Sequence, residues 1–474
     1  MASLKKNIFY NSIRVGSNLV FPLVTFPYVT RIMGPDTLGL FNYITAIAGY
    51  FTLFASLGFP IYGIREVAQS KDNPDKLQSA TNAIFTANIL ACLVVYAVYF
   101  IASLFLAHSE HNFWLYFVLG LSVLLSCISF DWFYQGVEDF KYITIRSIAI
   151  KLISIVCLFI FVRTNEDILP YAILTIAGTC GNNILNLIRI RKYIKLKISF
   201  QDCWKHTKGA SVLFLGTIAV SLYTNLNSVM VGALGTMAAV AFFTTGNKLV
   251  QMLMTVLGAV TSSIIPRMAY LVGKGDEKEA IALQKKTLNL LLYVSIPMVF
   301  GIIALAHPLI LLFGGKEFLP AVPVMQILSS LLVIITLSGF LGNQILIPMH
   351  KEKYGNYCVG GGAIANLTVN FMLIPLFAEI GVAIAVVIAE TVVTAMHFYF
   401  AHRYMKLKWM DFVPVKCILA SILMFLVIVA TYSNDFSPLC CFLWAIIGMI
   451  VYVVSLLGLK DQYFKETILK LIKR

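Results

Sequence analysis

The sequence predicts an all-α integral membrane protein with 14 transmembrane helices. Three observations lead to this fold class: an apolar composition, apolar runs of spanning length, and a bias of Lys and Arg toward alternate loops. Of the 474 residues, 59% are hydrophobic and 12% are charged, and the mean hydropathy is +0.85. A soluble domain carries about twice that share of charged residues. Runs of about 20 apolar residues suit spanning helices, and the alternating pattern of a transmembrane β-barrel does not occur.

Fourteen apolar runs, separated by polar or Gly- and Pro-containing breaks, follow one another along the chain. The predicted spans cover residues 8–30, 40–63, 80–107, 113–133, 147–162, 169–188, 210–233, 238–265, 287–306, 320–348, 355–376, 380–401, 415–433 and 438–458. The first run has full spanning length and no cleavage site, so we expect a helix and not a signal peptide. The nine cysteines show no metal-ligand spacing, so neither a disulfide nor a metal is expected.

The basic residues orient these spans. Of the 36 Lys and Arg residues, 31 lie in or beside the loops on one predicted face, three lie on the other face, and two lie inside spans, Arg14 and Lys248. Because Lys and Arg accumulate in short cytoplasmic loops, both termini are expected in the cytoplasm. The net charge of +14 is therefore attributed to topology and not to nucleic-acid binding. Short loops and the lack of a GxxxxGK[ST] motif disfavour a soluble catalytic domain and an ATP-driven pump.

A weak internal repeat predicts two lobes. The stretch "GIREVAQSKDNPDK" (63–76) follows the second span as "IPRMAYLVGKGDEKE" (265–279) follows the eighth, which places Arg65 and Arg267 at equivalent positions. We therefore expect a six-helix lobe over 1–209, a second over 210–401, and a terminal helix pair with a cytoplasmic tail over 402–474. In transporters with such repeats, the substrate site lies between them near the membrane midplane.

Charged side chains inside the predicted spans are the first candidates for a site. Asn11, Arg14, Asn18 and Thr25 share one face of the first helix. Arg14 either snorkels to the interface or lines a cavity, because a charge in the bilayer core is costly. The eighth span carries Thr244, Lys248 and Gln251 on one face, with Asn247 adjacent. Lys248 is interpreted as lining a hydrated cavity, or as pairing with Glu390 in the twelfth span.

Polar side chains on two other spans extend this set. Thr217, Ser221, Asn225 and Ser228 follow one face of the seventh span, and Asn366 and Asn370 lie four apart in the eleventh. Such groups either link helices by hydrogen bonds or line a polar cleft. The candidate substrate-binding residues are Arg14, Asn18, Asn225, Asn247, Lys248, Gln251, Asn366 and Asn370. Two intramembrane cations, with no acid on the first helix, favour an anionic passenger such as a phosphate. Gly16, Pro22, Pro27 and Gly216 are expected to let these helices bend.

Several stretches resemble one protein family. They are "FPYVTRIMGPDTLGLFNY" (26–43), "SLGFPIYGIREVA" (56–68), "FDWFYQGVEDFKYITIR" (130–146), "SLYTNLNSVMVG" (221–232), "GNKLVQM" (246–252), "IIPRM" (264–268) and "GNQILIPMHKEK" (342–353). Together they are similar to the Wzx-type polysaccharide-biosynthesis flippases, which share a superfamily with the multidrug and toxin extruders and the lipid II flippases. The resemblance extends from about residue 5 to residue 400 and does not specify the sugar.

This resemblance implies a multi-pass protein of the bacterial inner membrane that is not an enzyme and has no cofactor. It would move an undecaprenyl-pyrophosphate-linked oligosaccharide to the outer leaflet by alternating access, with H⁺ or Na⁺ coupling for which Glu390 is the candidate. Arg14 would meet the pyrophosphate. The implied partners are the lipid-linked glycan, membrane lipid, and a polysaccharide polymerase with its chain-length machinery, but no nucleic acid. The candidate gate and headgroup residues, which could equally be ordinary interfacial charges, are Arg65, Asp131, Glu138, Arg146 and Arg267.

Three rival functions are weighed against this one. A multidrug extruder on the same fold should carry an acid in the core of the first lobe, whereas the first helix contains Arg14 and no Asp or Glu. A lipid II-type flippase remains open. A membrane glycan polymerase would need clustered acids or a sizeable extramembrane loop, and the outer loops are short.

Overall fold

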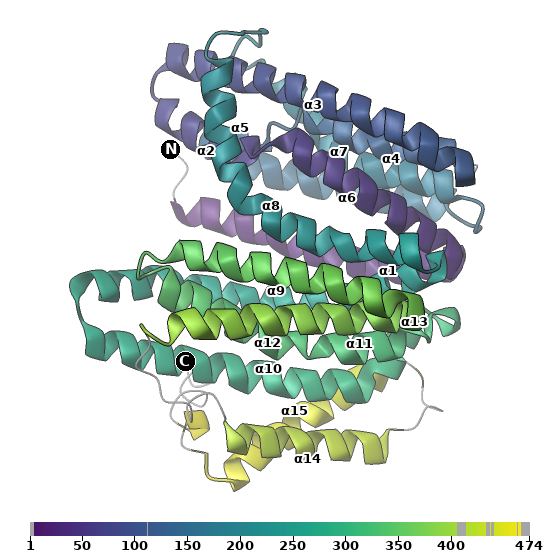
Figure 1. Ribbon diagram of the computed structural model, residues 1–474, viewed down its shortest axis with the longest axis vertical. Coiled ribbons are helices and arrows are strands. Elements are labelled where there is room, and N and C mark those ends of the chain that lie inside the picture. The colour runs from purple at the N-terminus through teal and green to yellow at the C-terminus, as the bar shows by residue number, and fades with distance from the viewer. Residues whose placement is uncertain are drawn as a thin grey trace. The chain divides into compact units, whose positions relative to one another are not determined.

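The computed structural model describes residues 4–110, 112–404, 414–432, 437, 440–461 and 463–465 (Figure 1). Within these residues all regular secondary structure is helical, as predicted. The chain forms two compact units, unit 1 (Met1–Gly232) and unit 2 (Ala233–Arg474). Each is described separately below.

Unit 1 contains eight helices in the part of the chain that the structure describes. They are α1 (Leu4–Ser56), α2 (Phe59–Ser70), α3 (Pro74–Glu110), α4 (Phe113–Ser126), α5 (Asp131–Gly136), α6 (Phe140–Phe161), α7 (Ile168–Ile190) and α8 (Cys203–Leu234).

The long helix α1 contains the predicted span 8–30 and most of the predicted span 40–63, whose last residues lie in α2. Its backbone leaves the helical region at Gly34, where φ is 66° and ψ is 174°, so the two halves are separate helical segments. The backbone remains helical at Pro22 and Pro27, where bends were expected. A second break follows at Leu57 and Gly58, both with positive φ, and α2 begins directly afterwards.

Two of the family-like stretches pack against each other in the core of unit 1. The predicted span 113–133 is divided into α4 and the short helix α5, which presents Trp132, Phe133 and Tyr134 to the core. A Cβ at Gly63 of α2 would lie 2.4 Å from the Trp132 ring. Only glycine therefore permits this close approach of α2 and α5.

Helices α1 and α6 run parallel in constant register. Thr144 donates to the Tyr10 carbonyl (2.9 Å), Lys151 donates to Ser17 Oγ (3.2 Å), and Tyr28 donates to the Val162 carbonyl (2.7 Å), each across 134 residues. Three contacts with the same separation show that the helices keep one register along their whole contact. A residue on α6 is therefore level with the residue 134 positions earlier on α1.

Unit 2 contains the remaining described helices. They are α9 (Met237–Lys274), α10 (Glu277–Phe313), η1 (Lys316–Phe318), α11 (Ala321–Ser329), α12 (Leu331–Leu341), the π-helical turn η2 (Gly342–Leu346), α13 (Glu352–Ala401), α14 (Val415–Thr431) and α15 (Cys441–Gly458). The predicted spans 355–376 and 380–401 are the two segments of α13, which is interrupted at Ala378 (φ 46°). The start of the last predicted span, at 438–439, lies outside the described residues.

Ten described segments are long and apolar enough to cross a membrane, so the protein is a multi-pass membrane protein.

The turns that follow α2 and α9 have the same hydrogen-bond pattern. Asn73 Oδ1 accepts the Lys76 N–H (3.1 Å), and Asp276 Oδ1 accepts the Glu279 N–H (3.2 Å). Each residue caps the next helix in the same manner.

Candidate functional site

Arg14 lies on the face of α1 that contacts α6. Its Nη2 donates to Asn11 Oδ1 (3.0 Å), one turn earlier, and its Nε is buried with no hydrogen-bond partner. Arg14 is half-buried, and a guanidinium with an unused donor has capacity for a further acceptor. The pairing of Arg14 with Asn11 agrees with the polar face predicted for the first helix.

Lys151 of α6 is the site residue that the sequence reasoning missed. It lies level with Ser17 and donates to both Ser17 Oγ and Asn18 Oδ1, and its Nζ lies 5.2 Å from the centre of the Phe21 ring. The charge count assigned Lys151 to the loop before α6, whereas the structure places it well inside that helix, a correction to the sequence analysis. Its position within the predicted span 147–162 was the available signal.

Arg14 and Lys151 together form a cationic pair, called here the Arg14–Lys151 site. Lys151 bonds to Ser17 and Asn18, which lie one helical turn after Arg14 on α1, so the two cations are neighbours. Within the described part of unit 1, no Asp or Glu forms an ion pair with either residue. Two like charges held together without a counter-ion favour a ligand of at least two negative charges, because each charge–charge contact at about 4 Å is worth about 1 to 4 kcal/mol.

Asp131 and Arg146 are brought together in a network that joins the starts of α5 and α6 to the last turns of α7. Arg146 is 3% exposed and donates through Nη2 to Asp131 Oδ1 (2.8 Å), through Nε to Asn182 Oδ1 (3.0 Å), and through Nη1 to Asn186 Oδ1. Asn186 Nδ2 also donates to Asp131 Oδ1 (2.7 Å). The Arg146 guanidinium therefore bonds to three side chains from two other helices, α5 and α7, and links these helices to α6.

Glu138 lies apart from that network. It accepts from Lys71 Nζ (2.9 Å), and this contact raises the pKa of Lys71. Glu138 also lines a pocket of about 450 Å³ with Lys6 and Lys141, beside the start of α1. The neighbouring Asp139 instead pairs with Arg189 of α7 (2.9 Å).

Arg65 and Arg267, which the sequence repeat places at equivalent positions, each contact one acid and one tyrosine ring. Arg65 pairs with Glu66 (3.5 Å) and lies over the Tyr62 ring, 5.3 Å from its centre. Arg267 pairs with Glu279 (3.2 Å) and lies 5.4 Å from the centre of the Tyr270 ring. Both guanidinium groups are more than half exposed, so both remain accessible to an anionic headgroup.

In unit 2, the predicted polar face of α9 is exposed. Lys248, Gln251 and Thr255 all have exposed side chains, and Asn247 and Thr244 are half-buried. These residues follow one another at helical spacing. The face that carries Lys248 is therefore not covered by the packing of unit 2.

The polar residues of α13 are buried. Asn370 Nδ2 donates to Asn366 Oδ1 (3.0 Å), both residues are fully buried, and Asn366 Nδ2 has no partner within the described residues. Glu390 is half-buried, and its carbonyl accepts from Thr394 Oγ1 (2.8 Å). Asn225 of α8 is half-buried in unit 1, whereas the side chains of Thr217 and Ser221 lie outside the described residues.

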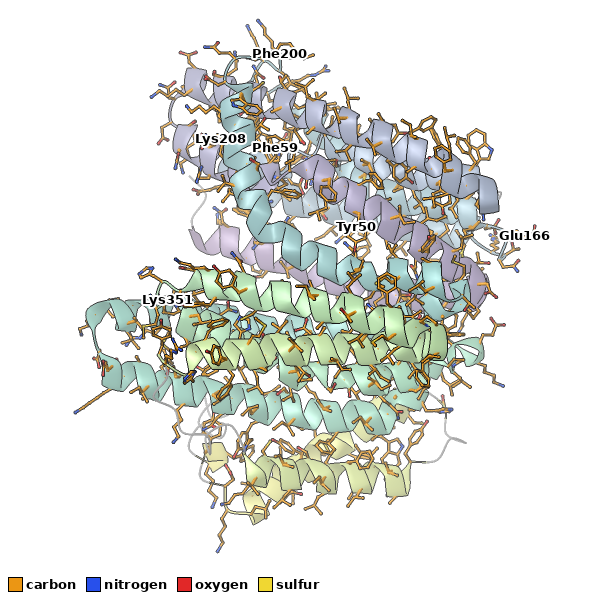
Figure 2. All side chains as sticks on the ribbon, in the orientation of Figure 1. Tyr50, Phe59, Glu166, Phe200, Lys208 and Lys351 are labelled. Carbon is orange, nitrogen blue, oxygen red and sulfur yellow. The ribbon has the colours of Figure 1, made fainter. Side chains whose placement is uncertain are left out.

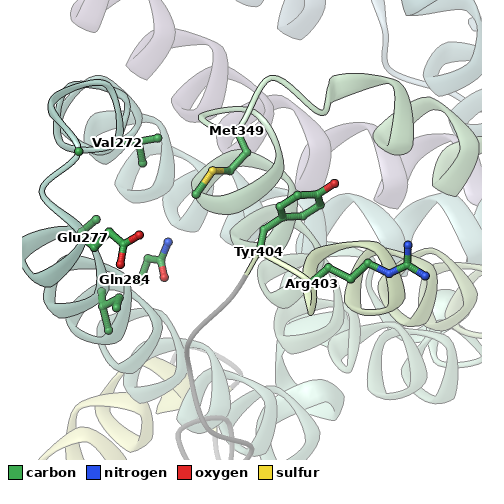
Figure 3. A pocket seen from close by; sticks show the side chains of 9 residues that line it. Val272, Glu277, Gln284, Met349, Arg403 and Tyr404 are labelled. Carbon is green, nitrogen blue, oxygen red and sulfur yellow. The ribbon is translucent and has the colours of Figure 1, made fainter.

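A pocket of about 390 Å³ lies at one end of unit 2 (Figure 3). Its lining residues come from the α9–α10 turn, the first turns of α10, the loop before α13 and the residues just after α13, and include Glu277, Gln284, Met349, Arg403 and Tyr404. The Lys351 ammonium lies 5.8 Å from the centre of the Tyr404 ring. The sequence analysis did not identify this pocket. It is distinct from the residues predicted to bind substrate.

A multi-pass helical chain with polar faces and cations inside its helices is typical of integral-membrane transporters. A structure of the lipid II flippase MurJ in an inward closed conformation has the same fold, with a TM-score of 0.75 at 15% identity, covering 97% of this chain and 100% of that one. The MatE family model matches residues 213–372.

The family model described as "Polysaccharide biosynthesis protein" matches residues 4–272, and the chain belongs to this family. It is a Wzx-type flippase of the multidrug/oligosaccharidyl-lipid/polysaccharide exporter superfamily. A putative O-antigen transporter of Escherichia coli K12 is 29% identical over 422 residues, which cover 85% of this chain and 97% of that protein. A probable low-salt glycan biosynthesis flippase, Agl15 of Haloferax volcanii, is 22% identical over 308 residues, 65% of this chain and 64% of that protein.

Proposed function

We propose that this protein moves undecaprenyl-pyrophosphate-linked oligosaccharide repeat units from the inner to the outer leaflet of the bacterial cytoplasmic membrane. The observation that carries the proposal is the Arg14–Lys151 site, a cationic pair without a carboxylate partner in the described part of unit 1. A pyrophosphate supplies the multiple negative charge that such a pair attracts. The names of the glycan transporters among its relatives point to the same substrate class.

The proposed topology has 14 spans with both termini in the cytoplasm. Lobes 1–209 and 210–401 would open alternately to the two sides of the membrane, and helices within 402–474 would complete the bundle. Arg14 would enter the bilayer from the cytoplasmic side about 10 Å deep, at 1.5 Å per residue. The parallel course of α1 and α6 agrees with their both running outward in this topology.

Each predicted site residue has a role in this proposal. The Arg14–Lys151 site and Lys248 would hold the pyrophosphate at successive stages, and the sugars would be hydrogen-bonded by amide side chains, namely those of Asn18, Asn225, Asn247, Gln251, Asn366 and Asn370. Arg65 and Arg267 would receive the headgroup at the inner surface. Asp131 and Arg146 would hold α5, α6 and α7 together at the cytoplasmic side. Glu138 would lie at the pocket beside the start of α1.

Partners and energy coupling follow from the same substrate. Repeat units delivered to the outer leaflet must be joined, so a polysaccharide polymerase and chain-length machinery are the expected partners. Glu390 is proposed to couple transport to H⁺ or Na⁺, since a carboxylate within a span is costly unless it serves a pathway or a partner. No catalytic step is assigned to the protein.

A multidrug extruder is the main alternative. Such a protein should attract cationic compounds, whereas the Arg14–Lys151 site would repel them. Clustered acids, which a glycan polymerase would need, are likewise not found near this site in the described residues.

Complementation of a deletion strain tests the proposal. Arg14→Ala, Lys151→Ala and Lys248→Ala should each reduce surface polysaccharide at least about fivefold at normal membrane levels, because each removes a charge worth about 1 to 4 kcal/mol to the bound diphosphate. Arg163→Gln, which changes an exposed cation at the other end of α6, is the matched control and should export normally. Normal polysaccharide in all three alanine variants would contradict the proposed role of these cations.

A further inference from the structure

The connection between α7 and α8 is an extended segment held against α3 by a regular set of side chains. Gln78 Oε1 accepts the Lys195 N–H (3.2 Å), Asn82 Oδ1 accepts the Lys197 N–H (3.2 Å), and Thr86 Oγ1 accepts the Ser199 N–H (2.9 Å). Asn82 Nδ2 donates in turn to the Lys195 carbonyl (3.2 Å).

This ladder matches the geometry of the two elements. Four residues of helix rise about 6.0 Å, and two residues of extended chain rise about 6.6 Å. Polar side chains at every fourth position of α3 therefore meet every second amide of the connection. The backbone N–H groups of Lys195, Lys197 and Ser199 are each bound by a side chain of α3, and these contacts hold the extended segment in place.

Fixing the backbone determines which side chains face outward. Ile194 is buried in the core of unit 1 and Leu196 packs against it, whereas Lys195 and Lys197 are exposed. Beyond Lys197 the alternation stops. The next large apolar side chains are all exposed, Ile198 by 68%, Phe200 by 70% and Trp204 by 80%. Figure 2 shows Phe200 at the periphery of unit 1.

Cations surround these three apolar side chains. Lys195 and Lys197 precede them, and Lys205 and Lys208 follow on the first turns of α8, all with exposed side chains. Asp202 is the single acid between residues 191 and 208. Figure 1 shows the start of α8 (teal) crossing the ends of other unit 1 helices before it turns to run alongside them. Exposed aromatic and basic residues at helix ends are typical of a membrane–water interface.

We propose that residues 195–208 form a docking surface for the anionic lipid leaflet. Ile198, Phe200 and Trp204 enter the interfacial region of the cytoplasmic leaflet, and Lys195, Lys197, Lys205 and Lys208 contact its anionic headgroups. Basic clusters beside spanning helices bind anionic lipids in this way. The assignment to the cytoplasmic leaflet rests on the proposed topology, but lipid contact does not depend on the proposed substrate.

An aqueous partner fits this surface less well than lipid does. An acidic protein could satisfy the lysines, but three exposed large apolar side chains at the periphery of a membrane-embedded unit lie where lipid is the surrounding solvent. The hydrogen bonds from α3 also fix the backbone that carries Ile198 and Phe200, so these side chains point outward. This connection within unit 1 would thereby be held at a fixed depth in the membrane.

Trp204 provides a direct probe of this surface. The full-length protein is reconstituted in phosphatidylcholine vesicles that contain either brominated phosphatidylglycerol or brominated phosphatidylcholine, and tryptophan quenching is measured. The contribution of Trp204 is the difference between the native protein and Trp204→Phe. Trp114→Phe is the matched control, because Trp114 is 65% exposed and begins α4 at the opposite end of α3.

The proposal predicts that Trp204 is quenched more by the brominated anionic lipid than by the brominated neutral lipid, and that Trp114 shows no such preference. Lys195→Gln with Lys197→Gln keeps the backbone ladder and should lower the preference by about fivefold per charge at low salt. Equal quenching of Trp204 by both lipids, quenching by neither, or a preference unchanged in the lysine variant would each overturn it. No glycan or export is measured, so a failure here is separable from failure of the proposed function.

Discussion

At the scale of single residues, two cationic groups of unit 1 have opposite surroundings. Arg146 is enclosed by Asp131, Asn182 and Asn186, so all its sides are used within the protein. Arg14 has a buried Nε without a partner and a second cation, Lys151, nearby. A fully satisfied guanidinium stabilises the fold, whereas an incompletely satisfied one has capacity to bind a ligand. The two arginines are therefore assigned different tasks.

Removing the carboxylate from the Arg146 network should destabilise unit 1. Asp131→Ala leaves a buried guanidinium without its counter-ion, which typically costs about 3 kcal/mol. In detergent, the purified Asp131→Ala variant should unfold at a clearly lower temperature than the native protein.

The matched control for this variant is Glu138→Gln. It breaks the ion pair with Lys71 at the surface of unit 1, so it should lower stability much less than Asp131→Ala does. Equal unfolding temperatures for Asp131→Ala and the native protein would show that Arg146 does not depend on this contact.

At the scale of elements, breaks inside long helices are set by individual backbone positions. Gly34 divides α1 with φ 66° and ψ 174°, a combination that is essentially restricted to glycine. Pro22 and Pro27 lie inside α1 without such a departure. The departure from helical backbone angles inside α1 therefore lies at Gly34 and not at either proline.

Substitutions at Gly34 and Gly16 should separate the need for the Gly34 backbone conformation from the general helix propensity of alanine over glycine. Gly34→Ala places a Cβ in a disfavoured conformation, which should destabilise the protein by about 1 to 3 kcal/mol. Gly16→Ala in the same helix has no atom within 4 Å of its new Cβ, and its expected effect is a stabilisation of less than about 1 kcal/mol. Thermal unfolding of the two variants measures the contrast. If both changes had the same sign and size, the break at Gly34 would not be required by the fold.

At the scale of the whole molecule, much of the fold was predictable because spanning helices leave long apolar runs. The breaks at Gly34 and Ala378 fall between predicted spans. The division of 113–133 into α4 and α5 was not predictable, because the residues at the break, "CISF" (127–130), are mostly apolar and packing decides their conformation.

The candidate site was predictable in part for a related reason. Arg14 and Lys248 were visible because each is isolated in an apolar run. Lys151 was counted with the cytoplasmic loop residues, and its partnership with Ser17 and Asn18 depends on tertiary register. Contacts across 134 residues leave no signal in one sequence.

Ion coupling is a property of the complete transport cycle. If Glu390 exchanges H⁺ or Na⁺, then Glu390→Gln should flatten the dependence of transport on pH or sodium while substrate binding is retained. Transport by the purified variant is measured in vesicles across imposed ion gradients. An unchanged dependence would remove Glu390 from this role.

The central claim is that the Arg14–Lys151 site binds a diphosphate, and the binding of undecaprenyl pyrophosphate to the purified protein tests it most directly. The native protein should prefer undecaprenyl pyrophosphate to undecaprenol. The double variant Arg14→Gln/Lys151→Gln should lose at least about tenfold of that preference, corresponding to about 1.4 kcal/mol, whereas Arg163→Gln should retain it. Undiminished preference in the double variant would contradict the account.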